Sequence, residues 1–527
     1  MAKKIMIQGT MSNSGKSFVA AALCRIFKQD GYSVAPFKSQ NMALNSYITK
    51  DGLEIGRAQA MQAEAAGIAP TVDMNPILLK PTSQMGSQVI VNGEVFGNLR
   101  AMDYYRRKTE FIPAVREAFE RLESQFDAIV LEGAGSPAEI NLRDNDIVNM
   151  GMAKIANAPV LLVGDIDRGG VFASLYGTVS LLEPEERARI KGLIINKFRG
   201  DVKILEPGLR MIEERLRIPV VGVIPMEQID LDDEDSLSDR LVRTKAQDGL
   251  DVAVIHLPHI SNFTDFNALE HYDGVSLRYV DRPAHLGRPD LILLPGTKNT
   301  MADLKWLRES GLEAMIWRLV EEQKVPVIGI CGGYQMLGEQ LSDPHGVEGE
   351  PGSTMRGMGL LAAETIFAAE KTRTRTEGTV MAAAGVYGQV TGQSVKGYEI
   401  HMGETFPAEA GSGLNGSQQA GAGQQPGNAS RADHSVTPAI CLADGRMDGF
   451  VRADGLVFGS YLHGLFDNLE FTGAILTRLA EKKGISLTAK AQSMEEYKES
   501  QYDKLADLVR RSLDIEAVYK IMEEYES

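Results

Sequence analysis

The chain has 527 residues, of which 43% are hydrophobic and 24% are charged. This is ordinary globular usage and excludes wholesale disorder, and at roughly 100–200 residues per domain the length predicts two to four domains. Lysine and arginine total 55 against 71 aspartates and glutamates, which gives a net charge of −16. Because a nucleic-acid-binding protein needs a basic face, we expect no nucleic-acid partner.

The number of cysteines and the lengths of the apolar runs indicate the cellular compartment in which the protein works. The three cysteines, Cys24, Cys331 and Cys441, are far apart and odd in number. They argue against a disulfide framework and a cysteine-rich metal site, and they favour a reducing cytoplasm. Apolar runs such as APVLLVG are well short of the ~20 residues of a membrane span. The run IMI after the N-terminal MAKK is too short for a signal peptide. We expect a cytoplasmic protein without a membrane partner and leave the oligomeric state open.

Short apolar runs alternate with helical stretches along the chain. The first set, in residues 1–230, is KKIMIQG, SVAPFK, DAIVLEGAG, APVLLVGDI, IKGLIINK and IPVVGVIP. The second set, in residues 251–485, is LDVAVIHLP, VSLRYV, PDLILLPG, VPVIGICGG and GLVFGSYLHG. This alternation is typical of a mostly parallel sheet with helices on both faces. The sequence therefore predicts an α/β protein with two doubly wound domains.

Three segments fall outside the two predicted sheets. Residues 231–250 are acidic and lack apolar periodicity, so we interpret them as a linker. Residues 408–435 are rich in Gly, Ser, Gln and Asn, which predicts a flexible surface insertion in the second domain. Residues 486–527 are charged and helical in pattern, and we expect these C-terminal helices to pack on the second domain.

A glycine-containing loop joins the first apolar run to a helical stretch, in KKIMIQGTMSNSGKSFVAAALCRIF. Such a loop directs backbone N–H groups and a helix N-terminus at phosphate, while the lysine supplies charge and the serine hydroxyl a magnesium ligand. The loop is one residue longer than the common G-x4-G-K-[ST] pattern and resembles the dethiobiotin-synthetase variant, G-T-x-[ST]-x-x-G-K-[ST]. The predicted ATP-binding residues of this loop are Gly9, Thr10, Gly15, Lys16 and Ser17.

Polar residues at later strand ends extend this site. Glu132, in LEGAG, follows a strand at the end where open α/β sheets bind ligands, so it is a candidate Mg²⁺ ligand together with Ser17. Asn196 and Lys197 follow another strand, and such an Asn-Lys pair can bind a nucleotide base through its amide, although the dipeptide alone is a weak signal. As a lone carboxylate, Glu132 is also compatible with a simple turn.

Cations and amides near the same strand ends are candidates for binding an anionic substrate. KSQNMALNS, which begins at Lys38 and includes Asn41, follows the second strand with polar side chains in place of apolar ones. Arg143, Arg168 and Arg199 would add local positive charge despite the net charge of −16. Each isolated cation is also compatible with a solvated surface position. The candidate substrate-binding residues are Lys38, Asn41, Arg168 and Arg199.

The second domain contains the pattern G-x-C-x-G, from Gly329 to Gly333, between a strand and a helix. A tight strand–turn–helix corner exposes its central side chain and requires small neighbours, so Cys331 lies where a nucleophile is expected. The following helix N-terminus favours the thiolate. The backbone N–H groups predicted to form an oxyanion hole are those of Gly296, Thr297 and Gly332.

A cysteine nucleophile requires a base. His463, in GSYLHGLFDN, follows a strand late in the domain and is the predicted base. His401, in KGYEIHMG, ends another strand and is the competitor, for which we expect mainly a structural or substrate-positioning role.

Taken together, these motifs resemble a dethiobiotin-synthetase-type, P-loop ATP-binding domain followed by a class I glutamine amidotransferase domain of flavodoxin-like fold. This combination is similar to the cobalamin-pathway amidases, and within them to the cobyric acid synthase family. The stretches that carry the resemblance are GTMSNSGKS, PFKSQNMALNS, DIDRGGVFAS, INKFRGD, PGTKNT, GICGGYQMLG, GYEIHMG and SYLHGLFDN. The sister family of cobyrinic acid a,c-diamide synthases carries a different segment where this chain has KSQNMALNS.

The resemblance implies ATP- and glutamine-dependent amidation, with ATP and Mg²⁺ bound and glutamine as the nitrogen donor. It implies amidation of the b, d, e and g carboxylates of adenosylcobyrinic acid a,c-diamide to give adenosylcobyric acid, through an acyl phosphate. It assigns Cys331 as glutaminase nucleophile and His463 as its base. Wider class I amidotransferases have Glu two residues after this His, where this chain has Leu465. Two alternatives stay open: cobyrinic acid a,c-diamide synthase and, from another class, a partition-type regulatory ATPase.

Overall fold

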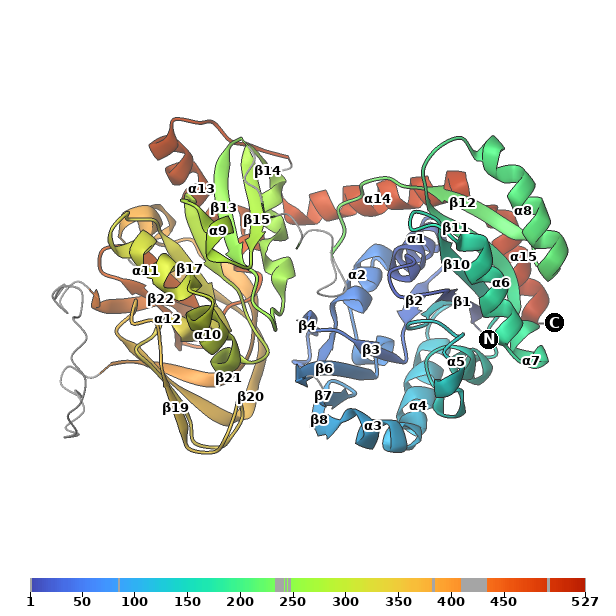
Figure 1. The fold of residues 1–527 in the computed structure, drawn as a ribbon, viewed down its shortest axis with the longest axis horizontal. Helices are drawn as coiled ribbons and strands as arrows, with labels where there is room; N and C mark the ends of the chain where they lie inside the picture. The colour runs from blue at the N-terminus through green and yellow to red at the C-terminus, as the bar shows by residue number, and fades with distance from the viewer. Residues whose placement is uncertain are drawn as a thin grey trace. The chain divides into compact units, whose positions relative to one another are not determined.

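A computed structural model describes residues 2–83, 86–232, 241, 244, 248–381, 384–408, 434–490 and 493–526. The chain forms two compact units, one of Met1–Asp235 with Glu495–Ser527 and one of Ser236–Met494 (Figure 1). Residues 409–433 of the predicted insertion at 408–435 and most of the predicted linker at 231–250 lie outside the described residues. Within the described part of the chain, no helix is long and apolar enough to cross a membrane.

The first unit is built on a six-stranded sheet that contains all six predicted strands. Its order is β12-β11-β10-β1-β9-β2, and every neighbouring pair is parallel. The strands are β1 (Lys3–Gly9), β2 (Val34–Phe37), β9 (Ala128–Glu132), β10 (Val160–Asp165), β11 (Ile190–Phe198) and β12 (Val220–Pro225). Both faces are buried, which explains why these strands are continuous apolar runs.

Helices cover both faces of this sheet, as the doubly wound prediction requires. Alternate residues of β1 enter different cores, Ile5 and Ile7 in one and Met6 in the other. The Ile5 core includes α1 (Lys16–Gln29), α2 (Arg57–Ala66), α14 (Met494–Ser512) and α15 (Ile515–Glu526). The Met6 core includes α4 (Ile112–Glu123), α5 (Met150–Ala156), α6 (Val171–Leu181) and α8 (Val202–Leu216).

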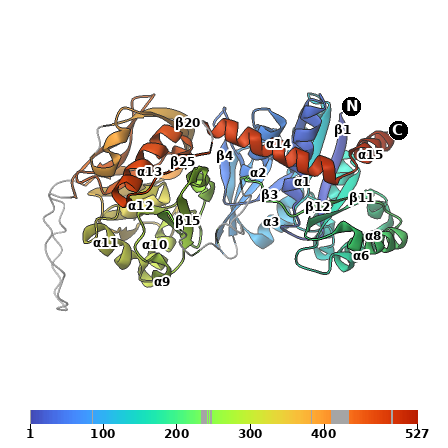
Figure 2. The same ribbon diagram turned by 90° about the horizontal axis from the view of Figure 1, so that it is seen from above.

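The C-terminal helices correct one expectation. They pack on the first unit and not on the second, as Figures 1 and 2 show for α14 beside α1. Leu505 and Leu508 of α14 are fully buried in the same core as α1, and Arg25 of α1 forms ion pairs with Glu499 and Asp503, both at 2.8 Å. Their charged, amphipathic sequence predicts helices, but it contains nothing that selects which domain receives the apolar face.

A small sheet that we did not predict lies within the first unit, between β2 and α4 in sequence. It has the order β3-β6-β7-β8, and β4 and β5 form a separate pair. The strands are β3 (Gln40–Met42), β4 (Ser46–Ile48), β5 (Glu54–Gly56), β6 (Ile77–Ser83), β7 (Gly86–Val91) and β8 (Glu94–Arg100), and helix α3 (Ala101–Arg107) follows β8. Strand β3 carries Asn41. The short helix α7 (Pro184–Arg187) lies elsewhere in the unit, between α6 and β11.

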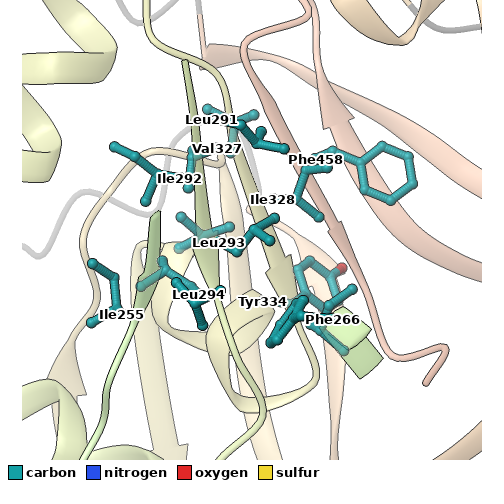
Figure 3. Packing of buried hydrophobic residues seen from close by; sticks show 14 of the residues in the cluster. Ile255, Phe266, Leu291, Ile292, Leu293, Leu294, Val327, Ile328, Tyr334 and Phe458 are labelled. Atoms are coloured by element: carbon teal, nitrogen blue, oxygen red, sulfur yellow. The ribbon is translucent and has the colours of Figure 1, made fainter. Parts of the chain in front are cut away.

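The second unit contains the other five predicted strands as the parallel run β15-β13-β16-β17-β24. These are β13 (Leu250–Ile255), β15 (Val275–Val280), β16 (Leu291–Leu294), β17 (Val327–Ile330) and β24 (Val457–Ser460). The core between them and their helices is aliphatic and aromatic (Figure 3). The helices are α9 (Pro283–Leu286), α10 (Thr300–Glu309), α11 (Leu312–Glu321), α12 (Gly332–Leu337) and α13 (Leu469–Lys483).

Beyond β24 the sheet continues with strands that are mostly antiparallel to their neighbours. They are β18 (Gln340–Asp343), β19 (Ser353–Arg356), β20 (Ala363–Val380), β21 (Ser394–Pro407), β22 (Val436–Leu442) and β23 (Met447–Arg452). A two-stranded pair, β14 (Tyr272–Asp273) with β25 (Thr488–Ala489), completes the unit. Both units are thus α/β with mostly parallel central sheets, as predicted.

Candidate active sites

Cys331 occupies the corner between β17 and α12. Its backbone has φ 52° and ψ −111°, a conformation that a residue with a Cβ adopts only under strain of roughly 1–3 kcal/mol. The neighbouring glycines make the corner possible, because a Cβ on Gly333 would lie 2.1 Å from the Leu294 carbonyl oxygen. The thiol is largely buried and donates to the Ile400 carbonyl at 3.7 Å. The strained turn thus fixes the side chain that the sequence singled out.

The backbone groups predicted to form an oxyanion hole lie together at this corner. A Cβ on Gly332 would lie 3.1 Å from the backbone nitrogen of Thr297, so these two residues are neighbours. A Cβ on Gly296 would lie 3.1 Å from Cε1 of His463. The Thr297 hydroxyl donates to Asp303 at 2.5 Å, which fixes this loop. The structure therefore brings Gly296, Thr297 and Gly332 together at this corner, with Gly296 next to His463, and the oxyanion hole itself stays a prediction.

His463 lies one short segment beyond β24 and is paired with a carboxylate that the sequence analysis missed. Its Nδ1 lies 2.7 Å from Oδ2 of Asp265, whose Oδ1 accepts from the Gly464 backbone N–H at 3.1 Å. Because Asp265 holds the Nδ1 proton, Nε2 is the atom left for chemistry. Nε2 is buried and has no hydrogen-bond partner among the described residues.

Charge and burial act in opposite directions on His463. Burial lowers its pKa, but the Asp265 carboxylate and the nearby Cys331 together raise the pKa to about 10. The ring also stacks on Tyr398, with ring centroids 5.3 Å apart. His463 is therefore held in one orientation and charged at neutral pH.

Asp265 lies 198 residues before His463, in the 3-10 helix Phe263–His271. No spacing rule connects these two positions, so the sequence offered no signal for the pair. Leu465, at the position where wider class I enzymes carry Glu, is fully buried in the apolar core. The carboxylate is thus supplied from a different element of the same unit.

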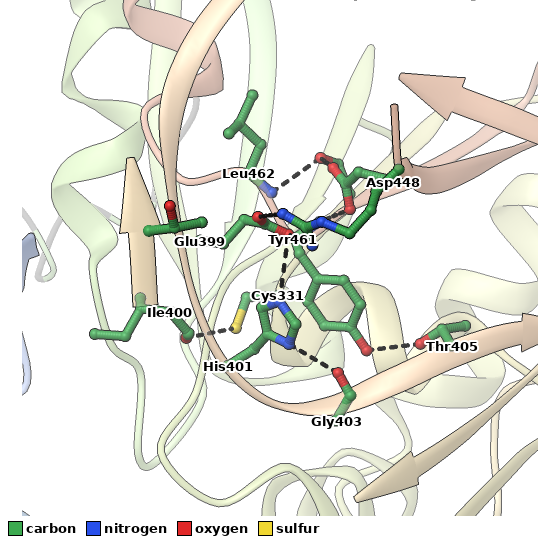
Figure 4. Close-up of polar contacts among 12 residues, drawn as sticks. Cys331, Glu399, Ile400, His401, Gly403, Thr405, Asp448, Tyr461 and Leu462 are labelled. Carbon is green, nitrogen blue, oxygen red and sulfur yellow. Dashed lines mark hydrogen bonds and ion pairs between the residues drawn. The ribbon is translucent and has the colours of Figure 1, made fainter. Parts of the chain in front are cut away.

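The competing histidine, His401, lies on β21 next to Ile400 (Figure 4). Its ring stacks on Tyr461 at a centroid distance of 3.8 Å. Its Nδ1 is 2.7 Å from the Gly403 carbonyl oxygen and its Nε2 is 3.5 Å from Glu399. Both nitrogens thus face groups of their own strand, a geometry that suits a positioning role better than a base.

The phosphate loop of the first unit runs from Gly9 to the start of α1. Gly15 has φ 96°, a left-handed conformation that favours glycine, and a Cβ on Gly9 would lie 2.1 Å from the Ser14 hydroxyl. The Thr10 N–H donates to the Val163 carbonyl at 3.0 Å. Lys16 donates to the carbonyls of Met11 and Gly135 at 3.0 and 3.1 Å. The loop therefore has the close-packed backbone that phosphate binding requires.

Glu132 is the centre of a buried polar cluster behind this loop. One oxygen accepts from Ser17 and from Lys38, both at 2.8 Å, and the other accepts from Gln62 at 2.6 Å. Within the described ranges there is no cluster of three or more His, Cys, Asp or Glu residues suited to a metal. Ser17 and Glu132 are nonetheless two adjacent oxygen donors, which fits Mg²⁺ because that ion takes few protein ligands beside phosphates and water.

Asn196 and Lys197 lie against the phosphate loop itself. The Asn196 side-chain amide donates to the Ser14 carbonyl at 2.9 Å, and Lys197 donates to the Asn13 carbonyl at 2.7 Å and pairs with Asp165 at 2.9 Å. These contacts fix the loop, and the predicted contact with the nucleotide base stays a prediction.

A cavity of about 410 Å³ opens beside the phosphate loop, within the first unit. Lys16, Lys38 and Asn41 line it. Two other predicted substrate residues do not, because Arg199 is exposed and paired with Asp167 at 2.8 Å, and Arg168 is exposed beside that pair. The structure thus brings Lys38 and Asn41 to the phosphate loop and leaves Arg168 and Arg199 outside this cavity.

Comparison with known proteins identifies a family for each of the two units. Residues 5–239 match the CobQ/CobB/MinD/ParA nucleotide binding domain family, and residues 251–471 match the CobB/CobQ-like glutamine amidotransferase domain family. A cobyric acid synthase of Lachnoclostridium phytofermentans is 55% identical over 99% of this chain and 100% of its own length. One from Ruminiclostridium cellulolyticum is 54% identical, covering 99% of this chain and 98% of the relative, and one from Streptococcus sanguinis is 50% identical, covering 99% of each. The chain therefore belongs to the cobyric acid synthase family.

Proposed function

We propose that this enzyme uses ATP and glutamine to amidate the b, d, e and g carboxylates of adenosylcobyrinic acid a,c-diamide, giving adenosylcobyric acid. The observation that carries the proposal is the 55% identity with a cobyric acid synthase over essentially the whole chain, which includes both sites. The three unpaired cysteines support a cytoplasmic location.

In the second unit the geometry supports glutamine hydrolysis. Cys331 attacks the side-chain amide of glutamine as the thiolate, its proton having passed to His463, and the N–H groups of Thr297 and Gly332 stabilise the oxyanion that forms. His463, oriented by Asp265, donates a proton to the departing ammonia, which leaves a thioester on Cys331. Water then hydrolyses the thioester to glutamate and restores the thiol, with His463 accepting and returning the proton.

In the first unit the geometry supports carboxylate activation. Amide formation from a carboxylate is unfavourable in water, so the γ-phosphate of ATP first converts the carboxylate to an acyl phosphate. The loop from Gly9 to Ser17 cradles the phosphates, and Lys16 neutralises charge on them. Ser17 and Glu132 would hold Mg²⁺, which when bound neutralises the phosphate charge. Ammonia then displaces phosphate from the acyl group.

The alternatives are less well supported. A regulatory ATPase does not need the strained Cys331 corner or the Asp265–His463 pair. A cobyrinic acid a,c-diamide synthase would not be expected to have full-length relatives named cobyric acid synthase at 48–55% identity.

The test is incorporation of nitrogen from glutamine labelled with ¹⁵N in its amide. Incubation of the enzyme with ATP, labelled glutamine and adenosylcobyrinic acid a,c-diamide should give a product carrying four labelled nitrogens, and none without ATP. In parallel, cobyrinic acid without the a and c amides should be a poor substrate. Labelling confined to the a and c positions would identify the other synthase, and ATP hydrolysis without label transfer would support the regulatory ATPase.

A further inference from the structure

The cavity beside the phosphate loop has a limited size and a mixed lining. About 410 Å³ lies near the small end of the ~300–1,000 Å³ that encloses drug-sized ligands. A corrinoid with its ring and side chains is larger than that. A single carboxylate side chain of such a substrate is small enough for the cavity, whose lining also includes the exposed apolar residues Met42 and Leu142.

Four cations line this cavity, and three of them already have a role. Lys16 belongs to the phosphate loop. Lys38 is neutralised by the buried Glu132 at 2.8 Å. Arg143 is paired with Glu183 at 2.7 Å and lies 3.8 Å from Glu186. These three are therefore poorly placed to supply charge for a substrate carboxylate.

The fourth cation, Lys108, begins the 3-10 helix Lys108–Phe111 directly after α3. It is partly buried, and among the described residues no carboxylate lies within ion-pair distance of its ammonium group. Burial lowers its pKa, and the nearby Asp146 acts in the opposite direction. A partly buried cation without an ion-pair partner is costly unless an anion binds there.

Asp146 does not serve as that partner. Its carboxylate accepts three backbone N–H groups, those of Val148, Asn149 and Gly151, at 2.8 to 2.9 Å. Its oxygens are thus used to shape the loop before α5. The charge of Lys108 remains available to a ligand in the cavity.

We propose that Lys108 binds the carboxylate of the corrinoid side chain that is being activated. This inference rests on the proposed function and deepens it by naming a substrate-binding residue. Since the cavity admits one side chain at a time, the carboxylate at Lys108 is the reacting one, and each of the four amidations uses the same contact.

The test compares Lys108→Met with the wild-type enzyme, using ammonium as the nitrogen source so that glutamine hydrolysis is bypassed. Loss of a charged hydrogen bond predicts an increase of about 10- to 100-fold in KM for the corrinoid, similar for all four amidations. The KM for ATP and the glutaminase rate should not change. Lys108→Arg, which keeps the charge, should recover most of the affinity.

The matched control is Arg106→Met, which removes an exposed positive charge two residues earlier, outside the cavity lining. It should leave the KM for the corrinoid unchanged.

The inference is overturned if Lys108→Met keeps a wild-type KM. It is also overturned if Arg106→Met raises the KM for the corrinoid as much as Lys108→Met does. The same holds if the rise in KM becomes smaller with each amidation, because both results indicate general attraction between a positive surface and a polyanion. If Lys108→Arg and Lys108→Met both lose affinity for the corrinoid and both have lowered thermal stability, Lys108 has a structural role and the inference is overturned. If the wild-type enzyme amidates no corrinoid, the proposed function itself fails.

Discussion

Replacement of Asp265 by Asn tests the catalytic geometry of the second unit. The change keeps the size of the side chain and removes the charge that faces His463 Nδ1 at 2.7 Å. In the native structure the pKa of His463 is about 10, against an ordinary value of 6.5, and Asp265 is the main group that raises it. At 1.36 kcal/mol per pKa unit, this corresponds to about 5 kcal/mol favouring the imidazolium, as an order of magnitude.

Without the carboxylate, burial dominates and the pKa of His463 falls toward or below 6.5. The imidazole is then neutral at pH 8 and its tautomer is no longer fixed. Because proton transfer by a positioned group contributes roughly 10²–10⁴-fold, we expect the glutaminase kcat of Asp265→Asn to fall by that range. Ammonium-dependent amidation should continue at the wild-type rate.

The pH dependence of glutaminase kcat/KM provides the sharper readout. A raised pKa means that His463 stays protonated until the pH rises through about 10, so the wild-type activity that depends on the imidazolium should persist to that pH. The same pair contributes stability that is fully present below pH 6.5 and is lost as the pH rises toward 10. In Asp265→Asn the alkaline limb should move down by several pH units.

Asp281→Asn is the matched control, because it removes a carboxylate from a half-buried His–Asp pair of the same unit, with His285 at 3.1 Å. It should change neither the rate nor the pH profile. Glutaminase activity of Asp265→Asn within about threefold of wild type, with an unmoved alkaline limb, would refute the assignment of Asp265 as the residue that orients His463.

Four further changes have defined outcomes. Cys331→Ala should abolish glutamine-dependent amidation and retain the ammonium-dependent rate, and loss of both or retention of both would contradict the nucleophile assignment. Lys16→Ala should abolish amidation with either nitrogen source, measured by ¹⁵N incorporation, and residual turnover near wild type would contradict the phosphate-loop role. Gly333→Ala places a Cβ 2.1 Å from the Leu294 carbonyl oxygen and should sharply reduce glutaminase activity, whereas an unchanged rate would show that the corner adapts. Leu508→Ala in α14 should lower the free energy of unfolding by about 2–5 kcal/mol with normal glutaminase kinetics, because α14 packs on the first unit; a selective loss of glutaminase activity would contradict that packing.

The net charge of −16 poses a question for an enzyme whose proposed substrates are ATP and a polycarboxylate. The structure shows positive groups concentrated beside the phosphate loop despite the negative net charge. Lys16 and Lys108 line one cavity beside the phosphate loop, whose backbone N–H groups add to their field. Lys38 and Arg143 line the same cavity but are already paired with Glu132 and Glu183. Two residues that the sequence suggested for the same task, Arg168 and Arg199, lie outside it.

Several elements could be predicted because the signal for each one is local. All eleven predicted strands are present, since a strand buried on both faces must be a continuous apolar run. The Cys331 corner was also predictable, because a strand, a turn with obligatory glycines and a helix follow one another within a few residues. The mostly antiparallel strands from β18 to β23 and the small sheet around β3 were missed, since their alternating polar pattern is a weaker signal.

What the sequence by itself determined is therefore the class of fold and the local form of the phosphate loop and of the Cys331 corner, whereas the roles of Cys331 as nucleophile and His463 as base stay predictions. Only the tertiary structure decided which distant groups surround them. Asp265 reaches His463 across 198 residues, Lys38 and Gln62 meet on Glu132, and α14 returns to the first unit. The physical reason is that a turn or an apolar run is specified by neighbouring residues, whereas a buried ion pair is specified by where the chain folds back, which no local spacing records.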